Sequence, residues 1–359
     1  MNETVSIITP SFNRASLVTE TAESILAQTY PHWEWMIVDD GSTDNSWDVL
    51  RELARKDSRI KIFQRDREPK GACTCRNTAV EKCTGKYLIF LDTDDLLAPF
   101  CLEQRVAAMQ QQPDMDFIIF PLLLFHKEVN DVNLLWNIDK EMDDLMRMLI
   151  NDPVCQGTGT LWKKSTFQEV GMWREDLKIW QDVELHIRSF LWPVKHDKRF
   201  DLKPDVYLRM SDDSLSRVGY HAPAKVNSRM QVFNYACKAV AEKGLMNKYK
   251  KSLQTMGLEI ILSAVFQRQF KAGNETIAIG KKYHLYNQKE LRDIRTFLLV
   301  HQFKLTKIQS IKSKYFQIVS AIAPKANATV GITPYQNGTA THAARGDDSN
   351  SHIALNLVC

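Results

Sequence analysis

Three carboxylates lie within four positions in the segment Asp92-Thr93-Asp94-Asp95, directly after the apolar run of residues 87–91. An apolar run of this length, bounded by polar residues, is typical of a buried strand. Carboxylates crowded at the end of such a strand repel one another unless a cation lies between them. Oxygen ligands suit a hard divalent cation, and Mg²⁺-type ions generally bind together with phosphate. The segment therefore predicts a metal–phosphate site at the carboxyl end of a sheet, where open α/β sheets place ligands.

The elements that must position this cluster alternate between strand and helix patterns. Strands are expected over residues 5–9, 33–38, 60–63, 87–91 and 116–124, and helices over residues 17–26, 47–56, 71–85 and 102–111. This alternation predicts an α/β fold with a mostly parallel sheet and covering helices. A second acidic turn, Asp39-Asp40, follows the second strand, so both acidic turns fall at strand carboxyl ends.

The remainder of the chain divides by composition. We expect a flexible loop at residues 156–160, a helix beginning near residues 180–185 and a strand at residues 207–210, followed by a helical pattern over about 224–322. The last residues are rich in Ala, Asn, Thr, Gly and Ser, a composition that predicts disorder or a segment foreign to the fold. The expected division is a sheet domain over 1–223, a helical C-terminal region over 224–325 and a disordered tail over 326–359.

Composition limits the function classes. The chain has 359 residues, of which 44% are hydrophobic and 25% charged, as in ordinary soluble globular proteins. Its net charge of +4 is too small to indicate a nucleic-acid partner. It contains no apolar run long enough for a transmembrane helix and no signal-peptide pattern at its beginning. Its seven scattered cysteines favour reduced thiols, so we expect a cytoplasmic location.

Membrane contact is suggested by one basic stretch, residues 304–325, in which lysines alternate with apolar residues at helical spacing. Such a helix can lie on an anionic membrane surface, which would place the protein peripherally on the inner face of the cytoplasmic membrane. The alternative is an amphipathic helix packed on its own domain with solvated lysines.

Five segments, in order, resemble the motifs of family 2 glycosyltransferases of the GT-A (Rossmann-like) fold. They are residues 5–14, residues 38–44, the Gly71…Arg76-Asn77 stretch, residues 90–95 and residues 181–185. The last of these segments resembles the acceptor-site motif of that family. A single Asp-x-Asp would be a weak signal, whereas five motifs in register over about 220 residues are specific. The resemblance implies a nucleotide-diphosphate sugar as donor, with a UDP-sugar favoured.

The resemblance gives the acidic cluster a chemical task. Breaking the bond between sugar and diphosphate builds negative charge on the β-phosphate, and a bound metal ion neutralises that charge. Asp94 is the first choice as metal ligand and Asp95 the second, whereas Asp92 is expected to orient the ion or its waters. The resemblance implies Mn²⁺ or Mg²⁺, and the spacing alone does not choose between them.

The resemblance also implies residues that bind the nucleotide. Asp40 would accept the ring N–H of uracil or thymine with Asp39 as its neighbour, and the base and ribose pocket would be lined by Thr9, Pro10 and Phe12. Arg76 would pair with the diphosphate or with Asp94, because a guanidinium suits both; the alternative is a structural ion pair. Arg217, after Ser214 and Ser216, would belong to a lid on the diphosphate, unless the segment is a plain turn.

Asp182 is the predicted general base. An inverting transfer needs one carboxylate to take the proton of the acceptor hydroxyl as its oxygen attacks the anomeric carbon. The alternative for Asp182 is capping of the helix that follows it. Nearby, Trp173 and Trp180 either stack on a sugar or pack in the core. His186, one turn later, either contacts the acceptor or the metal, or is a satisfied neighbour.

These expectations describe an inverting, metal-dependent glycosyltransferase. It would move a sugar from a nucleotide-diphosphate donor to a glycan or lipid-linked acceptor in cell-surface polysaccharide synthesis. One alternative is a sugar-phosphate nucleotidyltransferase, but such enzymes usually carry a glycine-rich basic loop after the first strand, and residues 10–13 do not form one. The other alternative is a catalytically silent module that binds a nucleotide sugar or a glycan.

Overall fold

The computed structural model describes residues 3–211, 219–303, 333–336 and 339–340. Its larger sheet contains seven strands in the order β10-β6-β9-β4-β1-β2-β3. These strands are β1 (Val5–Ser11), β2 (Trp33–Asp39), β3 (Ile60–Gln64), β4 (Tyr87–Phe90), β6 (Phe117–Ile119), β9 (Thr160–Lys163) and β10 (His196–Lys198). Only β9 runs antiparallel to its neighbours, so the predicted mostly parallel sheet is confirmed.

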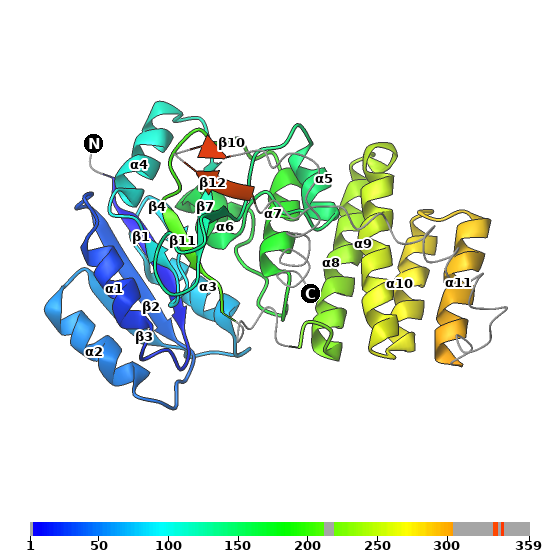
Figure 1. Cartoon of the computed structure of the whole chain (residues 1–359), viewed down its shortest axis with the longest axis horizontal. Helices are drawn as coiled ribbons and strands as arrows, with labels where there is room; N and C mark the ends of the chain where they lie inside the picture. The colour runs from blue at the N-terminus through cyan, green and yellow to red at the C-terminus, as the bar shows by residue number, and fades with distance from the viewer. Residues whose placement is uncertain (1–2, 212–218, 304–332, 337–338, 341–359) are drawn as a thin grey trace.

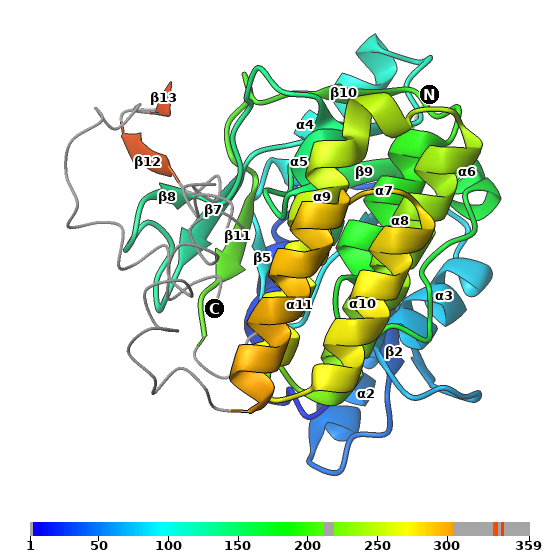
Figure 2. The ribbon, with the colours of Figure 1, turned by 90° about the vertical axis from the view of Figure 1, so that its right-hand side faces the viewer.

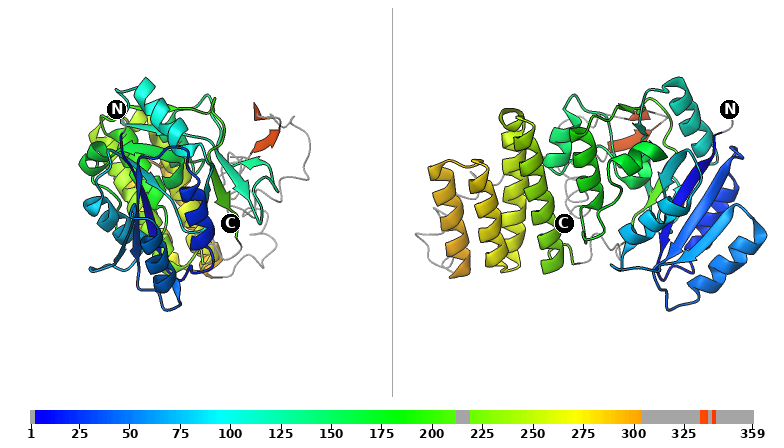
Figure 3. Two further views of the ribbon diagram at one scale, coloured as in Figure 1. Left: turned by 90° about the vertical axis from the view of Figure 1, so that its left-hand side faces the viewer. Right: turned by 180° about the vertical axis from the view of Figure 1, so that it is seen from behind.

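Helices cover both faces of this sheet, because successive residues of a buried strand point to opposite sides. On one face, Ile7 and Ile37 share a core with α1 (Val18–Leu26), α2 (Ser46–Lys56) and α4 (Cys101–Gln111). On the other face, Ile8 and Phe90 pack with α3 (Ala72–Lys82), α5 (Asp144–Leu149), α6 (Lys164–Glu169) and α7 (Gln181–Leu191). Figures 1 and 3 show the strands between these two helical layers.

A smaller six-stranded sheet has the order β13-β12-β8-β7-β11-β5. Its strands are β5 (Leu96–Leu97), β7 (Leu122–Phe125), β8 (Leu134–Leu135), β11 (Val206–Arg209), β12 (Thr333–Gln336) and β13 (Thr339–Ala340). The prediction of one strand over residues 116–124 is therefore wrong, since β6 and β7 belong to different sheets. Pro121 between them has no N–H to give to a ladder, and the Leu122 N–H donates to Asn137 Oδ1 at 3.0 Å instead.

The described part of the C-terminal region, up to residue 303, contains four helices, in agreement with the helical pattern expected from about residue 224. They are α8 (Pro223–Glu242), α9 (Met246–Phe266), α10 (Phe270–Lys282) and α11 (Gln288–Gln302), which lie side by side (Figures 1 and 2). Their buried residues, such as Val226, Phe233 and Leu253, belong to the same hydrophobic cluster as those of α3 and α7. The helical region thus extends the core on one face of the sheet.

Several predicted features lie outside the described residues. These are Arg217 with its neighbouring serines, and the basic stretch 304–325. Of the segment 326–359 the structure describes β12 and β13 alone, so the disordered tail and the domain boundaries stay predictions. Among the described helices, none combines the length and the apolar character that crossing a membrane requires.

Candidate functional site

A pocket of about 320 Å³ opens where β1, β2 and β4 end and α3 begins. Six of the residues predicted for donor and metal binding line it: Pro10, Phe12, Asp40, Arg76, Asp92 and Asp94. The lining also includes Ser11, Arg14, Gly71, Ala72 and Thr93. The edge of the sheet therefore brings together the motifs that follow three different strands, as expected for ligand sites in open α/β folds.

Asp40 is held on one side of the pocket by an arginine that the sequence did not single out. Its Oδ1 accepts hydrogen bonds from Arg65 Nε at 2.6 Å and from the Gly71 N–H at 3.3 Å. Arg65 also donates to the Arg67 carbonyl at 2.5 Å and to Glu68 at 3.0 Å, which fixes the guanidinium itself. The Asp40 carboxylate is thus pre-oriented toward the pocket by its partners.

Thr9 and Asp39 do not line the pocket, although the resemblance placed both in it. Thr9 is fully buried, and its hydroxyl accepts from Trp35 Nε1 at 2.8 Å. Asp39 shapes the turn after β2, because its carboxylate accepts from the backbone N–H groups of Gly41 and Ser42 and from the Ser42 hydroxyl. Both residues support the shape of the pocket from beneath it.

The three carboxylates of the acidic cluster have separate environments. Asp92 Oδ1 accepts from Arg76 Nη2 at 2.6 Å, and Asp94 lines the pocket. Asp95 is buried away from the lining, and its Oδ1 accepts from the Arg209 N–H at 3.0 Å. Burial and the neighbouring carboxylates raise the pKa of both Asp94 and Asp95, that of Asp95 well above its ordinary value. The Asp94 carboxylate is therefore the one of the pair that faces a ligand.

Arg76 lines the pocket and lies near enough to Asp182 for their charges to interact. Its guanidinium carbon is 5.0 Å from the ring centre of Trp173, and its Nε is buried with no partner in the part of the chain described. The charges of Asp92 and Asp182 both act on this guanidinium. A cation placed between two carboxylates lets both stay ionised while they lie close together.

Asp182 is not a helix cap. It occupies the first turn of α7, whose N-cap residue is Trp180 in a left-handed conformation (φ 62°) without a capping side-chain bond. Asp182 Oδ1 instead accepts from the Gly157 N–H at 2.9 Å. Burial raises the pKa of the Asp182 carboxyl, whereas Arg76 and the Gly157 N–H oppose that rise. A carboxylate with these properties can act as a base.

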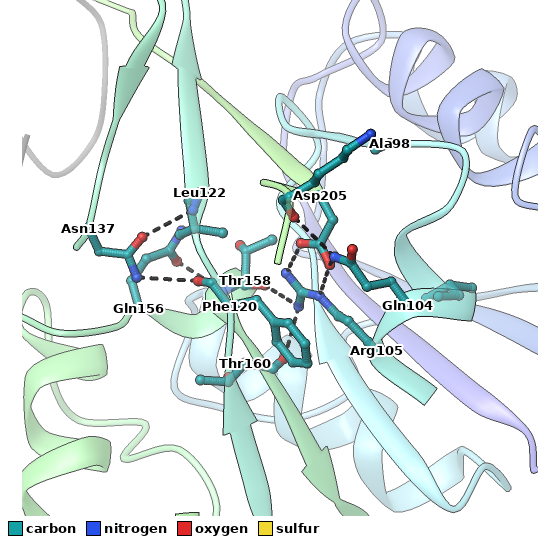
Figure 4. Close-up of polar contacts among 12 residues, drawn as sticks. Ala98, Gln104, Arg105, Phe120, Leu122, Asn137, Gln156, Thr158, Thr160 and Asp205 are labelled. Atoms are coloured by element: carbon teal, nitrogen blue, oxygen red, sulfur yellow. Dashed lines mark hydrogen bonds and ion pairs between the residues drawn. The ribbon is translucent and has the colours of Figure 1, made fainter. Parts of the chain in front are cut away.

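The turn that carries Gly157 is a buried 3₁₀ turn (Gly157–Gly159), so the expected flexible loop at 156–160 is wrong. Arg105 on α4 fixes this turn by donating to the carbonyls of Thr158 at 2.8 Å and Thr160 at 3.3 Å. The same guanidinium forms a fully buried ion pair with Asp205 at 2.7 Å (Figure 4). The Gly157 N–H is thereby tied to the core of the protein.

The aromatic residues near Asp182 belong to the core. Trp173 and Trp180 are 2% and 7% exposed, and Trp173 packs edge-to-face on Phe90. His186 is fully buried with Nδ1 2.8 Å from the Asp182 carbonyl oxygen, so Nδ1 carries the proton. Burial lowers the pKa of His186 to about 4, so it is neutral at pH 7. Core packing is therefore supported for both tryptophans, whereas His186 is buried beside Asp182 with its Nε2 lacking a hydrogen-bond partner in the described part of the chain.

Comparison with known proteins relates part of this arrangement to a family. Residues 6–171 match the model of glycosyl transferase family 2. This part of the chain, which carries the pocket residues, is therefore similar to glycosyl transferase family 2. The matched part contains β1 to β4, the acidic cluster and the 157–159 turn, whereas Asp182 lies beyond it.

Two curated glycosyltransferases are similar to part of the chain. The putative teichuronic acid biosynthesis glycosyltransferase TuaG of Bacillus subtilis (strain 168) is 41% identical over 108 residues, which span 30% of this chain and 42% of TuaG. The UDP-Glc:alpha-D-GlcNAc-diphosphoundecaprenol beta-1,3-glucosyltransferase WfgD of Escherichia coli is 39% identical over 105 residues, which span 29% of this chain and 40% of WfgD. The chain thus matches less than half of either relative.

A solved structure resembles the chain over nearly its full length. Residues 1–349 of S. aureus TarS, in complex with UDP-GlcNAc, superpose with a TM-score of 0.61 at 15% identity, covering 95% of this chain and 99% of that chain. At this identity the likeness concerns the fold, and it confirms the expected GT-A arrangement. The helical region after residue 223 falls within the similarity, since 95% of the chain is covered.

The donor set of this pocket suits a metal ion that binds together with phosphate. The described residues contain no cluster of three or more His, Cys, Asp or Glu side chains that could cage an ion. Asp92 and Asp94 nevertheless both line the pocket. Mg²⁺-type ions are usually held by one or two carboxylates, with waters and substrate phosphates completing the shell. The residues present therefore fit such an ion through Asp94 and Asp92, and Asp95 is engaged elsewhere.

Two functional candidates, Arg65 and Gly157, were missed by sequence reasoning. The ion pair between Arg65 and Asp40 joins residues 25 positions apart and has no local signal. Gly157 was assigned to a flexible loop, although the alternation of Gly157-Thr158-Gly159 marks a place where larger side chains would collide with neighbours. Arg14, which lines the pocket near Asp94, was quoted within the first motif without a role.

Proposed function

We propose that this protein is an inverting, metal-dependent glycosyltransferase that takes a sugar from a UDP-sugar and transfers it to a lipid-linked or glycan acceptor. The observation that carries the proposal is a set of neighbouring ionisable groups: Asp94 and Asp92 in the pocket, Arg76 paired with Asp92, and Asp182, whose charge acts on Arg76. This set offers a site for a diphosphate and a carboxylate base near it. The name of WfgD, with its UDP-Glc donor and diphosphoundecaprenol acceptor, agrees with the donor and acceptor classes.

The nucleotide would occupy the pocket between the ends of β1 and β2. Phe12 is 38% exposed at its edge and offers a ring face to a base or ribose, with Lys70 Nζ 3.9 Å from the ring centre. Asp40, oriented by Arg65, would accept the N3–H of uracil. Cytosine has no hydrogen at N3, so a carboxylate at this place favours uridine nucleotides.

The diphosphate would lie over Asp92, Asp94 and the start of α3. Mn²⁺ or Mg²⁺, held by Asp94 with Asp92, would neutralise negative charge on the departing diphosphate. Arg14 and Arg76 both line the pocket and add positive charge there. Arg76 would orient Asp92 through their 2.6 Å contact and attract the phosphate oxygens.

Asp182 would take the proton from the acceptor hydroxyl. Its Oδ1 is held by the Gly157 N–H, and the raised pKa of the carboxyl makes its ionised form a stronger proton acceptor than an ordinary aspartate. The charge of Arg76, on the side of the pocket, favours the ionised form of Asp182 and so opposes the rise in its pKa. An acceptor oxygen that attacks from this side, opposite the diphosphate, would invert the anomeric carbon.

The same proposal includes the setting of the reaction. Cell-surface polysaccharide synthesis is supported by the names of TuaG and WfgD. A reducing cytoplasm agrees with the six described cysteines, which are buried free thiols. Peripheral contact with the inner face of the membrane would give the enzyme access to a lipid-linked acceptor.

A panel of nucleotide sugars, supplied with and without Mn²⁺, tests the function. We expect slow hydrolysis of one or more UDP-sugars that needs the metal, transfer when a diphospho-lipid carrying a sugar is added, and a product of inverted anomeric configuration by NMR. Binding of UDP without any turnover would instead support a silent binding module. Release of pyrophosphate from a nucleoside triphosphate and a sugar phosphate would support the nucleotidyltransferase alternative.

A further inference from the structure

The most exposed large hydrophobic side chains among the described residues gather at one end of the helical region. Phe266 is 68% exposed, Phe303 63% and Leu299 51%. Phe266 ends α9, whereas Leu299 and Phe303 lie one turn apart at the end of α11. Because α10 returns between these two helices, their C-termini lie at the same end of the bundle, the lower end in Figure 1. A soluble protein rarely exposes such a cluster without a partner.

Positive charge predominates at this end. The end is formed by three segments, residues 219–229, 263–274 and 295–303, which contain no Asp or Glu, although Glu275 follows the second segment with its Oε1 4.0 Å from Lys271 Nζ. The same segments contain Lys225, Arg229, Arg268, Lys271 and Arg295. Arg268, Lys271 and Arg295 are exposed, and Arg268 has a positive φ of 57° in the turn between α9 and α10. Apolar and cationic side chains are thus interleaved, as in Phe266-Gln267-Arg268-Gln269-Phe270-Lys271.

Hydrogen bonds connect this end to the start of α7, which carries Asp182. The Lys178 N–H, just before α7, donates to Ser228 Oγ at 2.8 Å on the first turns of α8. Arg229, the next residue, donates to Ser263 Oγ at 2.7 Å near the end of α9. Gln269 then donates to the His221 carbonyl at 2.7 Å. The exposed cluster and the proposed base therefore lie toward the same end of the molecule.

We propose that this end, defined by Phe266, Arg268, Lys271, Arg295, Leu299 and Phe303, is a membrane-docking face for anionic phospholipid. Aromatic and aliphatic side chains would enter the boundary between headgroups and acyl chains, and the three cations would lie among anionic headgroups. The excess of cations in the three segments, against Glu275 as the acid beside Lys271, favours an anionic lipid surface over a second copy of this chain, which would bring a net positive charge to the contact.

The docking face would orient the enzyme toward a membrane-bound acceptor. This part of the inference rests on the proposed function. A lipid-linked acceptor places its reactive sugar close to the membrane surface. Docking through the ends of α9 and α11 would turn the start of α7, and with it Asp182, toward that surface. The face is defined by described residues alone, and the basic stretch 304–325, which follows Phe303 in the sequence, is not part of that definition.

Sedimentation of the full chain with lipid vesicles tests the proposal without reference to catalysis. We expect the wild type to bind vesicles that contain phosphatidylglycerol and not vesicles of pure phosphatidylcholine, and the binding to weaken with salt. The triple variant Phe266→Ser/Leu299→Ser/Phe303→Ser should lose at least about tenfold in partitioning. The variant Arg268→Gln/Lys271→Gln/Arg295→Gln should lose a similar factor at low salt and little at high salt.

Trp192→Ser is the matched control, since Trp192 is 49% exposed at the opposite, C-terminal end of α7. Its partitioning should equal that of the wild type. All variants should hydrolyse a UDP-sugar in vesicle-free buffer at the wild-type rate, so loss of docking is distinguishable from failure of the proposed function. Unchanged vesicle binding of the triple variant would overturn the proposal. A triple variant that changes the oligomeric state while keeping its vesicle binding would also overturn it and assign the face to a second copy.

Discussion

The Gly157 N–H donates a hydrogen bond to Asp182 Oδ1 at 2.9 Å, across 25 positions of sequence. This bond joins a buried turn at the edge of the sheet to the first turn of the helix that carries the proposed base. Arg105 holds the turn from behind through the carbonyls of Thr158 and Thr160. The position of Asp182 is therefore set by a backbone group whose own position is fixed by the core.

Replacing Gly157 by alanine should impair transfer and spare donor binding. The new Cβ would lie 3.1 Å from Asp182 Oδ1 and 3.2 Å from Trp173 Cη2, and the buried Trp173 ring has little room to move. We expect Asp182 to be displaced and kcat to fall by about ten- to a hundredfold, because base and acceptor must be held closely aligned. UDP affinity, measured by calorimetry, should stay within about twofold of the wild type, as Gly157 does not line the pocket.

Gly159→Ala is the control for that substitution, because its Cβ would meet the side chain of Leu122 at 3.1 Å rather than Asp182. It should retain most of the activity. An equal fall in kcat for both alanine variants would show that the turn as a whole, and not its contact with Asp182, is what matters.

The pH dependence of kcat/KM follows from the pKa of Asp182. A general base must be ionised, so activity is lost as the pH falls through its pKa. Burial raises this pKa above the ordinary value for aspartate, so the acid limb of the profile should lie at higher pH than an unperturbed carboxyl would give. His186, whose pKa is lowered to about 4, stays neutral over the neutral range, and His186→Gln should leave the limb in place. If the acid limb of the kcat/KM profile shifts in His186→Gln, the titrating group that limits activity is the histidine and not Asp182.

Metal binding should distinguish two adjacent carboxylates. Asp94→Ala should abolish both Mn²⁺-dependent UDP binding and metal-dependent turnover, because Asp94 lines the pocket. Asp95→Asn keeps an oxygen for the Arg209 N–H and should hold Mn²⁺–UDP within about threefold of the wild-type affinity. Calorimetric titration with Mn²⁺ and UDP measures both. If Asp95→Asn loses as much affinity as Asp94→Ala, the metal role extends to Asp95.

Stability should depend on the buried ion pair behind the 157–159 turn. Arg105 and Asp205 are both fully buried and 2.7 Å apart. Arg105→Met would leave the Asp205 carboxylate without its main partner and should reduce the free energy of unfolding by about 3–5 kcal/mol. The double variant Arg105→Met/Asp205→Leu should recover part of that loss in urea denaturation. A double variant less stable than Arg105→Met alone would contradict this view of the pair.

The parts of the fold that sequence reasoning predicted correctly are those with a local signal. Apolar runs marked β1, β2 and β4, and helical spacing marked α1 to α4, to within a few residues. Since parallel strands end at one edge, the motifs that follow them were expected to meet, and Asp40, Arg76, Asp92 and Asp94 do meet at the pocket. The failure at residues 116–124 has a local cause as well, since Pro121 ends one sheet before another begins.

The parts that were missed depend on contacts between distant segments. Thr9 was expected in the pocket, but the pleat of β1 turns its hydroxyl toward Trp35. Arg65 reaches Asp40 from the segment after β3, and no spacing rule connects them. Glycines at 157 and 159 suggested mobility, whereas here their small size permits Trp173 and Leu122 to approach the backbone.

In the proposed mechanism, Asp182 removes the proton of the acceptor hydroxyl while the pocket holds the nucleotide-sugar donor. Parallel measurement of UDP affinity and of sugar transfer for Asp182→Asn tests it most directly, with Asp176→Asn, an exposed carboxylate six residues earlier, as control. We predict that Asp182→Asn lowers kcat for transfer by at least about a hundredfold, leaves the Kd for UDP within about twofold of the wild type, and folds as stably as the control. Loss of transfer and of UDP affinity in equal measure, or transfer at the wild-type rate, would contradict the assignment.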